Sequence, residues 1–158
     1  MKQILIASCS MLIAGVAAGP AGPAGAQDGA PRIDDIVWFN IDSYCSFGRV
    51  DHTVDYKDPE SWRWVLFSNY PGADGGDPLE SPFMRIDGQL AQLAQTGVET
   101  IDGGVVRTYS SHDAEPYVVQ LKMLEGAVGN ESTAFSGTIT VSRNGASSEV
   151  DYKGNCGV

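Results

Sequence analysis

The sequence predicts a mainly β protein: a single-domain antiparallel sandwich or small barrel of about eight strands with at most one short helix. Three observations support this fold class. Runs rich in β-branched and aromatic residues recur along the chain, turn-forming residues separate them at intervals of about 8 to 12 residues, and the C-terminal segment matches a β-hairpin in both turn and alternation. A chain of 158 residues is long enough to bury one hydrophobic core.

The first residues have the layout of a secretory signal peptide. Lys2 precedes an apolar run from Ile4 to Ala18, and a small-residue stretch ends in Ala24-Gly25-Ala26, which fits the A-x-A cleavage rule. We therefore expect residues 1–26 to be removed, with cleavage after Ala18 as an alternative. The apolar run is shorter than the roughly 20 residues of a transmembrane helix, so we expect no membrane insertion after processing.

The rest of the chain divides into a flexible tail, residues 27–32, and a single β-rich domain, residues 33–158. The export signal predicts a periplasmic or secreted location for this domain. A lipoprotein anchor at Cys9 is a further alternative, but very few apolar residues precede Cys9.

Two cysteines remain after processing, Cys45 and Cys156. An even number in an exported chain predicts one disulfide bond, and two free buried thiols are the alternative. The bond would close a long loop, which the chain-entropy account associates with about 4 to 5 kcal/mol of stabilisation.

The chain is strongly acidic, with a formal net charge of −10. Loss of Lys2 leaves 9 basic and 20 acidic residues, a net charge of 9 − 20 = −11. Such a domain is repelled by nucleic acid and by anionic lipid, so neither is expected as a partner. A cationic protein, for example an envelope-attacking lysozyme, is compatible with this charge, although acidity also simply favours solubility.

The N-terminal half of the domain contains three β-rich runs. The first, Ile36–Ile41, ends at Asp42-Ser43, and the second, Tyr44–Tyr56, changes its inward parity near Gly48, which predicts a β-bulge there. The third, Ser61–Asn69, carries apolar residues on both faces, which is typical of a central strand covered on both sides.

The middle of the chain is ambiguous. A turn-rich segment, Tyr70–Pro82, leads into an extended run at Phe83–Ile86. Residues 87–97 fit a short helix capped by Asp87, which we favour slightly, and they also fit a strand that continues through Gly88.

Two further strands follow, Val105–Ser110 and Tyr117–Leu124, and the second alternates clearly between apolar and polar residues. The last segment, Ala134–Val158, contains Asn144-Gly145, the strongest short signal for a type I′ hairpin turn. A two-residue turn at this position fixes the register of the two strands. It pairs Ile139 with Val150, Val141 with Ser148, Gly137 with Tyr152 and Phe135 with Gly154 on an inward face, and Thr140 with Glu149, Thr138 with Asp151 and Ser136 with Lys153 on an outward face.

Catalytic chemistry has little support in the sequence. His52 shares the parity of two valines, and His112 lies beside Asp113 in an expected turn. No nucleophile elbow, paired-histidine motif or CxxC motif occurs, so we assign no catalytic residue, no metal ligand and no cofactor. Trp62 and Trp64 share one strand face, which favours a place in the core over a carbohydrate-binding platform.

The sequence therefore favours a non-enzymatic binding or structural domain, with an envelope hydrolase as the rival class. The weak binding candidates are Asp74, Asp77 and Glu80, which lie in a long acidic loop that could contact a cationic protein. The same oxygen-rich loop leaves a calcium or small-ligand module as a third class, although the EF-hand pattern is absent.

Overall fold

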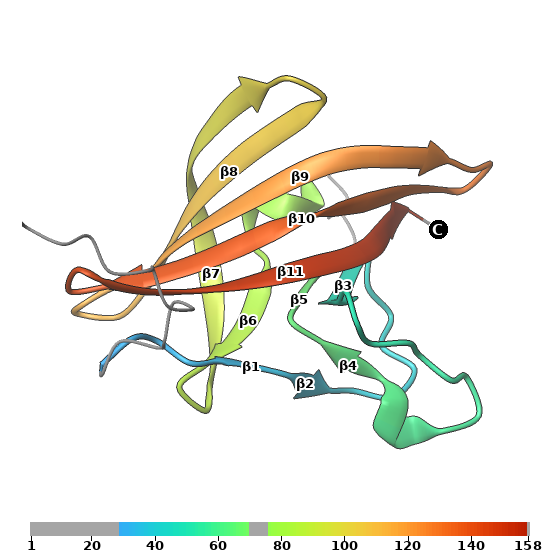
Figure 1. Ribbon diagram of the computed structural model, residues 1–158, viewed down its shortest axis with the longest axis horizontal. Helices are drawn as coiled ribbons and strands as arrows, with labels where there is room; N and C mark the ends of the chain where they lie inside the picture. The colour runs from blue at the N-terminus through green and yellow to red at the C-terminus, as the bar shows by residue number, and fades with distance from the viewer. Residues whose placement is uncertain (1–28, 70–75, 158) are drawn as a thin grey trace, which may run out of the picture.

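The computed structural model describes residues 29–69 and 76–157. The expected signal peptide, the first two residues of the expected tail and Asp74 lie outside the described residues. Figure 1 labels the strands, which are β1 (Ile33–Asp34), β2 (Ile36–Val37), β3 (Cys45–Arg49), β4 (Arg63–Trp64), β5 (Leu66–Ser68), β6 (Phe83–Ile86), β7 (Gln89–Ile101), β8 (Gly104–Ser111), β9 (Val118–Val128), β10 (Ser132–Arg143) and β11 (Ala146–Gly157). Two short 3-10 turns, η1 (Pro59–Ser61) and η2 (Pro78–Glu80), interrupt the connections.

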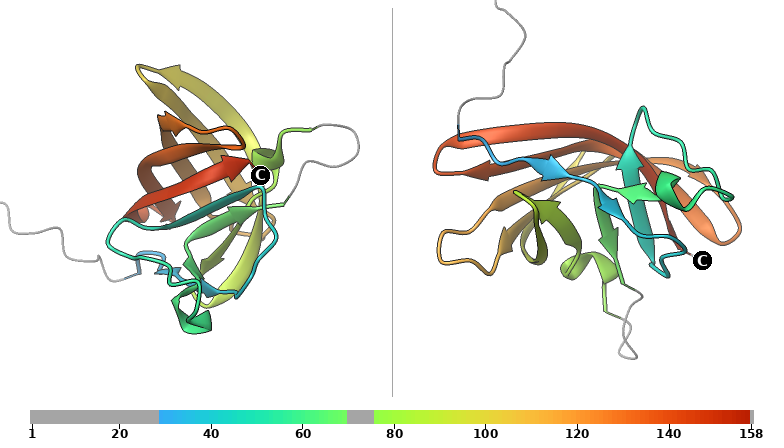
Figure 2. Two further views of the ribbon diagram at one scale, coloured as in Figure 1. Left: turned by 90° about the vertical axis from the view of Figure 1, so that its right-hand side faces the viewer. Right: turned by 90° about the horizontal axis from the view of Figure 1, so that it is seen from below.

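Eight of these strands close into an antiparallel barrel, which confirms the predicted fold class. The ring runs β6-β5-β3-β11-β10-β9-β8-β7, and pairing of β6 with β7 completes it. β1 adds to the ring as one extra strand beside β6, and β2 and β4 form a separate two-stranded sheet. Figure 2 shows the ring from two further sides, and Figure 1 shows the long strands β9, β10 and β11 side by side.

The C-terminal hairpin forms as the sequence predicts. Asn144 and Gly145 have φ values of 51° and 82°, as a type I′ turn requires, and every predicted cross-strand pair of β10 and β11 is present. Ile139 and Val141 on the inward face are fully buried, because a turn of this type fixes the parity of both strands.

The predicted disulfide is also present. Cys45 at the start of β3 and Cys156 near the end of β11 are direct cross-strand partners, and they are bonded to each other. This bond indicates an oxidising, exported environment. Across the described ranges, the structure contains no helix with the length and apolar character needed to span a bilayer.

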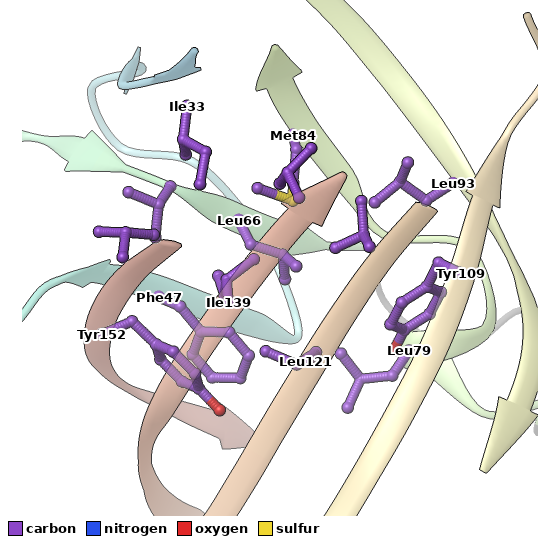
Figure 3. Packing of buried hydrophobic residues seen from close by; sticks show 14 of the residues in the cluster. Ile33, Phe47, Leu66, Leu79, Met84, Leu93, Tyr109, Leu121, Ile139 and Tyr152 are labelled. Atoms are coloured by element: carbon purple, nitrogen blue, oxygen red, sulfur yellow. The ribbon is translucent and has the colours of Figure 1, made fainter. Parts of the chain in front are cut away.

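The core fills the inside of the barrel. The alternation of β9 places Val119, Leu121 and Met123 inside, as the sequence predicts, and Tyr117 is buried just before this strand. Figure 3 shows how side chains from every side of the barrel meet, including those of Phe47, Leu66, Met84, Leu93, Tyr109, Leu121, Ile139 and Tyr152.

Residues 87–97 do not form the favoured helix, so that prediction is wrong. Asp87 and Gly88 have φ values of 50° and 82°, which makes them the two central residues of a tight hairpin turn between β6 and β7. The strand alternative is correct for residues 89–97, which lie in β7, but the strand does not continue through Gly88, where the chain turns. The pairing of β7 with both β6 and β8 overrides the local helical pattern.

The predicted bulge at Gly48 is absent. β3 pairs with β11 in unbroken register from Cys45 to Arg49, and the chain then turns away from the barrel. Val50, which the parity argument placed on an inward face, is half exposed in the connection to β4. The apparent parity change therefore marks the end of a strand.

The run Ser61–Asn69 is not one doubly covered strand. It bends at Val65, so that β4 belongs to the small outer sheet and β5 belongs to the barrel. Val65 and Leu66 are both fully buried at this bend, whereas Trp62 and Trp64 lie outside the core cluster. The expectation that these tryptophans belong to the core is therefore wrong.

Candidate functional site

The acidic loop predicted as a contact is partly described. Asp77 caps η2 by accepting a hydrogen bond from the backbone N–H of Leu79, and its other carboxylate oxygen pairs with the guanidinium of Arg107. Glu80, the last residue of η2, is exposed. The charge of Asp77 is thus already offset within the fold, and Glu80 is the freer of the two described candidates.

Neither histidine takes part in a catalytic arrangement in the part of the chain that the structure describes. The Nε2 atom of His52 lies 2.5 Å from the backbone oxygen of Ser61, so this ring acts as a donor that holds a connection in place. His112 is exposed in the connection between β8 and β9. Ser111, its neighbour, donates a hydrogen bond to Asp113 and not to a histidine.

Within residues 29–69 and 76–157, no group of three or more His, Cys, Asp or Glu side chains is arranged to hold a metal ion. The calcium alternative depended on the segment from Asp74 to Glu80, and Asp74 lies outside these ranges.

A cluster of aromatic rings lies outside the barrel core, with partly buried rings at Trp62 and Trp64 and exposed rings around them. Trp62 is at its centre, with its ring centroid 5.2 Å from that of Phe39, 5.6 Å from that of Tyr56 and 6.1 Å from that of Trp64. Each of these pairs has the edge-to-face geometry that aromatic rings prefer. We call the set Trp38, Phe39, Tyr56, Trp62 and Trp64 the aromatic surface.

The small outer sheet places these rings together. β2 pairs with β4, with Ile36 opposite Trp64, and the backbone N–H of Trp38 donates to the oxygen of Trp62 at 3.0 Å. Trp64 Nε1 lies 3.4 Å from the backbone oxygen of Trp38. Two chain segments far apart in sequence therefore present their rings on one surface.

The aromatic surface is anchored to the outside of the barrel. The ring of Trp38 packs edge-on against Phe67 of β5 at 5.7 Å, and Phe67 stacks on Phe83 of β6 at 5.2 Å. Phe67 is buried although it points away from the barrel core, because the outer sheet covers it. The outer surface of the barrel, at Phe67 and Phe83, thus supports the ring of Trp38.

The outer members of the cluster remain open to solvent. Trp38 is 49% exposed, Phe39 is 51% exposed and Tyr56 is 78% exposed, and Val37 beside them is 47% exposed. Single exposed apolar residues are ordinary, but a contiguous group of large rings on a soluble protein usually marks an interaction site.

Acidic residues frame the aromatic surface. The connection between β3 and β4, residues 50–62, carries four acidic residues and one basic residue, a net charge of 1 − 4 = −3. All four acids are exposed: Asp51, Asp55, Asp58 and Glu60.

This connection is internally ordered. Asp58 caps η1 by accepting from the backbone N–H of Glu60 at 3.0 Å. The hydroxyl of Ser61 donates to the backbone oxygens of Asp55 and Asp58, each at 2.8 Å, and accepts from the N–H of Asp55. The acidic groups and Tyr56 are consequently held in fixed positions, which lowers the entropic cost of binding.

A shallow groove continues from Tyr56 and Trp64 along the outside of the barrel. Its volume is about 580 Å³, and its opposite wall comes from the outer faces of β10 and β11, with Ser136 and Lys153 among the lining residues. The groove widens the surface on which a partner could rest.

Sequence reasoning missed this surface because it assigned Trp62 and Trp64 to a continuous barrel strand. A usable signal was present in the run Ile36–Ile41. It places Trp38 and Phe39 side by side and has almost no polar residues, so a strand formed by it would expose an aromatic ring on its outer face.

No protein family, curated protein or solved structure matches this chain. The function is therefore argued from its own residues.

Proposed function

We propose that this protein is an exported, periplasmic or secreted, non-enzymatic binding domain that docks a cationic protein on the aromatic surface. The observation that carries the proposal is the group of exposed rings at Trp38, Phe39 and Tyr56, which the small outer sheet holds on the outside of the barrel. Phe39 and Tyr56 both contact Trp62, and Trp38 packs on Phe67. Trp and Tyr are the residues most enriched in interface hot spots, where they contribute large rigid contacts.

Charge complementarity selects the partner. The net charge of −3 on residues 50–62 lies directly beside the rings, and the whole chain carries −10. A basic partner is attracted to such a surface, and acidic partners are repelled. Asp74, Asp77 and Glu80 remain proposed secondary contacts for a cationic partner, although the charge of Asp77 is offset by Arg107.

The three tryptophans of the chain all belong to the aromatic surface, which provides a direct test. The protein uniformly labelled with nitrogen-15 has three indole N–H signals, and unlabelled lysozyme serves as the cationic probe. We expect these three signals to shift on titration at low salt, and the shift to weaken as salt is raised. A neutral protein of similar size is the control, and it should leave the signals in place.

Two sets of variants separate apolar contact from steering. Trp38→Ala and Tyr56→Ala should each weaken binding by about tenfold or more through a faster dissociation rate, as expected for hot-spot residues. Val98→Ala, which removes an exposed apolar side chain on β7 (53% exposed), is the matched control and should change nothing.

Replacement of Asp51, Asp55 and Asp58 by Asn and of Glu60 by Gln should slow association, because steering acts mainly on that rate. Asn retains the capping role at position 58, so the melting temperature should hold. The same change at Asp74, Asp77 and Glu80 measures the contribution of the other acidic loop.

Unchanged affinity of the Trp38 and Tyr56 variants for a cationic partner would remove the aromatic surface from the interface. Efficient turnover of an envelope substrate by the purified domain would replace the binding role with the hydrolase alternative.

A further inference from the structure

A second, chemically different cleft lies at one end of the barrel. In Figure 1 the β10–β11 turn and the β8–β9 connection are at the left-hand end of the molecule, opposite the end of β11 that carries Cys156. The cleft there has a volume of about 420 Å³ and is lined by β6, β7, the β8–β9 connection and the last residue of β10. It does not share residues with the aromatic surface.

Arg143 supplies a fixed positive charge to this cleft. Its Nη1 donates to the hydroxyl of Tyr117 at 2.8 Å, and its guanidinium carbon lies 4.4 Å from the centre of the same ring. Among the described residues, no carboxylate lies within 4.0 Å of this guanidinium, and its Nε is buried without a hydrogen-bond partner. The side chain is thus held in place while its charge is not directly paired.

Tyr117 is itself positioned by the neighbouring hairpin. Its hydroxyl donates to Asp87 at 2.8 Å, and Asp87 also accepts from the backbone N–H of Arg32 at 2.8 Å. These two donors satisfy the Asp87 carboxylate within the fold. Asp87 therefore acts as a support for Tyr117, and it forms no direct ion pair with Arg143.

Asp113 supplies a fixed negative charge to the same cleft. It accepts a hydrogen bond from the hydroxyl of Ser111 at 2.7 Å, and that hydroxyl accepts from the backbone N–H of Tyr117 at 2.9 Å. Asp113 is exposed and forms no ion pair with any described residue.

Arg143 and Asp113 thus line one cleft with opposite charges, yet they lie more than 4.0 Å apart. Two such groups would attract each other, but each is held by a separate hydroxyl group. Leu90 and Ala91 on β7 supply accessible apolar surface to the same cleft, and the buried Ile86 lies behind them. This combination offers one site for an anion, one site for a cation and one site for an apolar group.

We propose that this cleft binds a small zwitterion of the amino-acid or short-peptide class. The ligand carboxylate pairs with Arg143, the ligand ammonium pairs with Asp113, and an aliphatic side chain packs on Leu90 and Ala91. The planar guanidinium suits a carboxylate because it can donate two parallel hydrogen bonds. A cleft of about 420 Å³ has room for a single amino acid or a dipeptide.

Calorimetric titration of the full chain with L-leucine tests the proposal, together with two analogues that each lack one charge. N-acetyl-L-leucine has no ammonium group, and L-leucinamide has no carboxylate. We expect leucine to bind at least tenfold more tightly than either analogue. Titration with Gly-Leu and with a leucine tripeptide distinguishes the free amino acid from a peptide as the source of the zwitterion.

Matched variants assign the two charges. Arg143→Gln and Asp113→Asn should each weaken leucine binding by tenfold or more, while Arg143→Lys should retain part of it. Glu115→Gln, in the same connection as Asp113 but outside the cleft, and Arg85→Gln on β6 are controls that should bind as the parent does. The melting temperature of each variant shows whether it folds.

Two results would overturn the proposal. One is equal binding of leucine and N-acetyl-leucine, since Asp113 would then play no part. The other is the absence of any heat, or of any shift in the backbone amide signals of residues 111–117, with leucine and Gly-Leu at millimolar concentration.

Discussion

Tyr152 on β11 lies directly opposite Gly137 on β10, and its hydroxyl reaches past that glycine to donate to the backbone oxygen of Lys122 on β9 at 3.0 Å. The tyrosine ring lies 3.5 Å from the point where a Cβ at residue 137 would stand. One side chain thus connects three adjacent strands of the barrel, and the glycine makes room for it.

Gly137→Ala should destabilise the fold clearly. An added Cβ would lie 2.0 Å from the oxygen of Lys122, so β9 and β10 would have to separate. We expect a loss of about 1 to 3 kcal/mol or more, as for other overpacked sites. Gly97→Ala on β7 is the control in the same denaturant titration, because its Cβ would meet Thr108 at an ordinary 3.9 Å. Similar stability of the two variants would contradict this account of Gly137.

Two buried tyrosines should respond differently to loss of their hydroxyl groups. Tyr152→Phe loses the hydrogen bond to Lys122 and should cost about 1 kcal/mol. Tyr109→Phe should cost less, because the buried hydroxyl of Tyr109 lies beside Arg107 without a hydrogen bond of ordinary geometry. Chemical denaturation of the two variants at neutral pH checks this difference.

Alkaline pH should destabilise the protein through the same two tyrosines. Burial raises the pKa of Tyr109 and of Tyr152 well above the ordinary value, so the folded state holds these protons more tightly than the unfolded state. Their contribution is therefore complete below the unfolded pKa of about 10 and declines as pH rises above it.

The double Phe variant should lose less stability than the parent between neutral pH and pH values above about 10. Denaturant titrations at a series of pH values measure this. Identical pH profiles for both proteins would show that these tyrosines do not cause the alkaline loss.

The register of the C-terminal hairpin predicts a contrast between adjacent residues. Ile139 is fully buried, so Ile139→Ala should cost about 2 to 5 kcal/mol. The hydroxyl of Thr140 faces outward and donates to Glu149 at 3.2 Å, so Thr140→Ala should cost far less. Equal losses at the two positions in a denaturant titration would refute the register.

The disulfide should contribute a large share of stability. Cys45 and Cys156 are separated by 111 residues in sequence, and removal of a bond that closes so long a loop typically costs about 2 to 5 kcal/mol. We expect the double Ser variant to unfold at lower denaturant than the parent. Mass spectrometry after alkylation without reduction should find no modified cysteine in the processed protein, and two modified thiols would disprove the bond.

Local patterns in the sequence were enough to predict the hairpin, its register and the inward face of β9. Asn144-Gly145 forces positive φ angles at one point, and strand alternation then assigns every following residue to a face. The disulfide was also predicted, on the expectation that Cys9 leaves with the signal peptide, which makes Cys45 and Cys156 the single possible pair.

Tertiary structure decided the outcome wherever a segment had two compatible local conformations. Residues 87–97 alternate and also repeat with helical spacing, and β8 on one side and β6 on the other selected the strand. The end of β3 at Arg49 and the bend at Val65 could likewise not be predicted from the sequence. The end of a strand depends on which neighbouring strand supplies its hydrogen bonds.

The candidate sites depend even more on tertiary structure. Trp38 meets Trp62 through the small outer sheet, and Arg143 and Asp113 line one cleft through barrel closure. The sequence by itself determined composition, the Asn144-Gly145 turn and strand alternation, all of which act over a few residues. Only the tertiary pairing of the barrel and of the outer sheet decided which distant side chains share a surface, because the separation of paired strands in the chain carries no local signal.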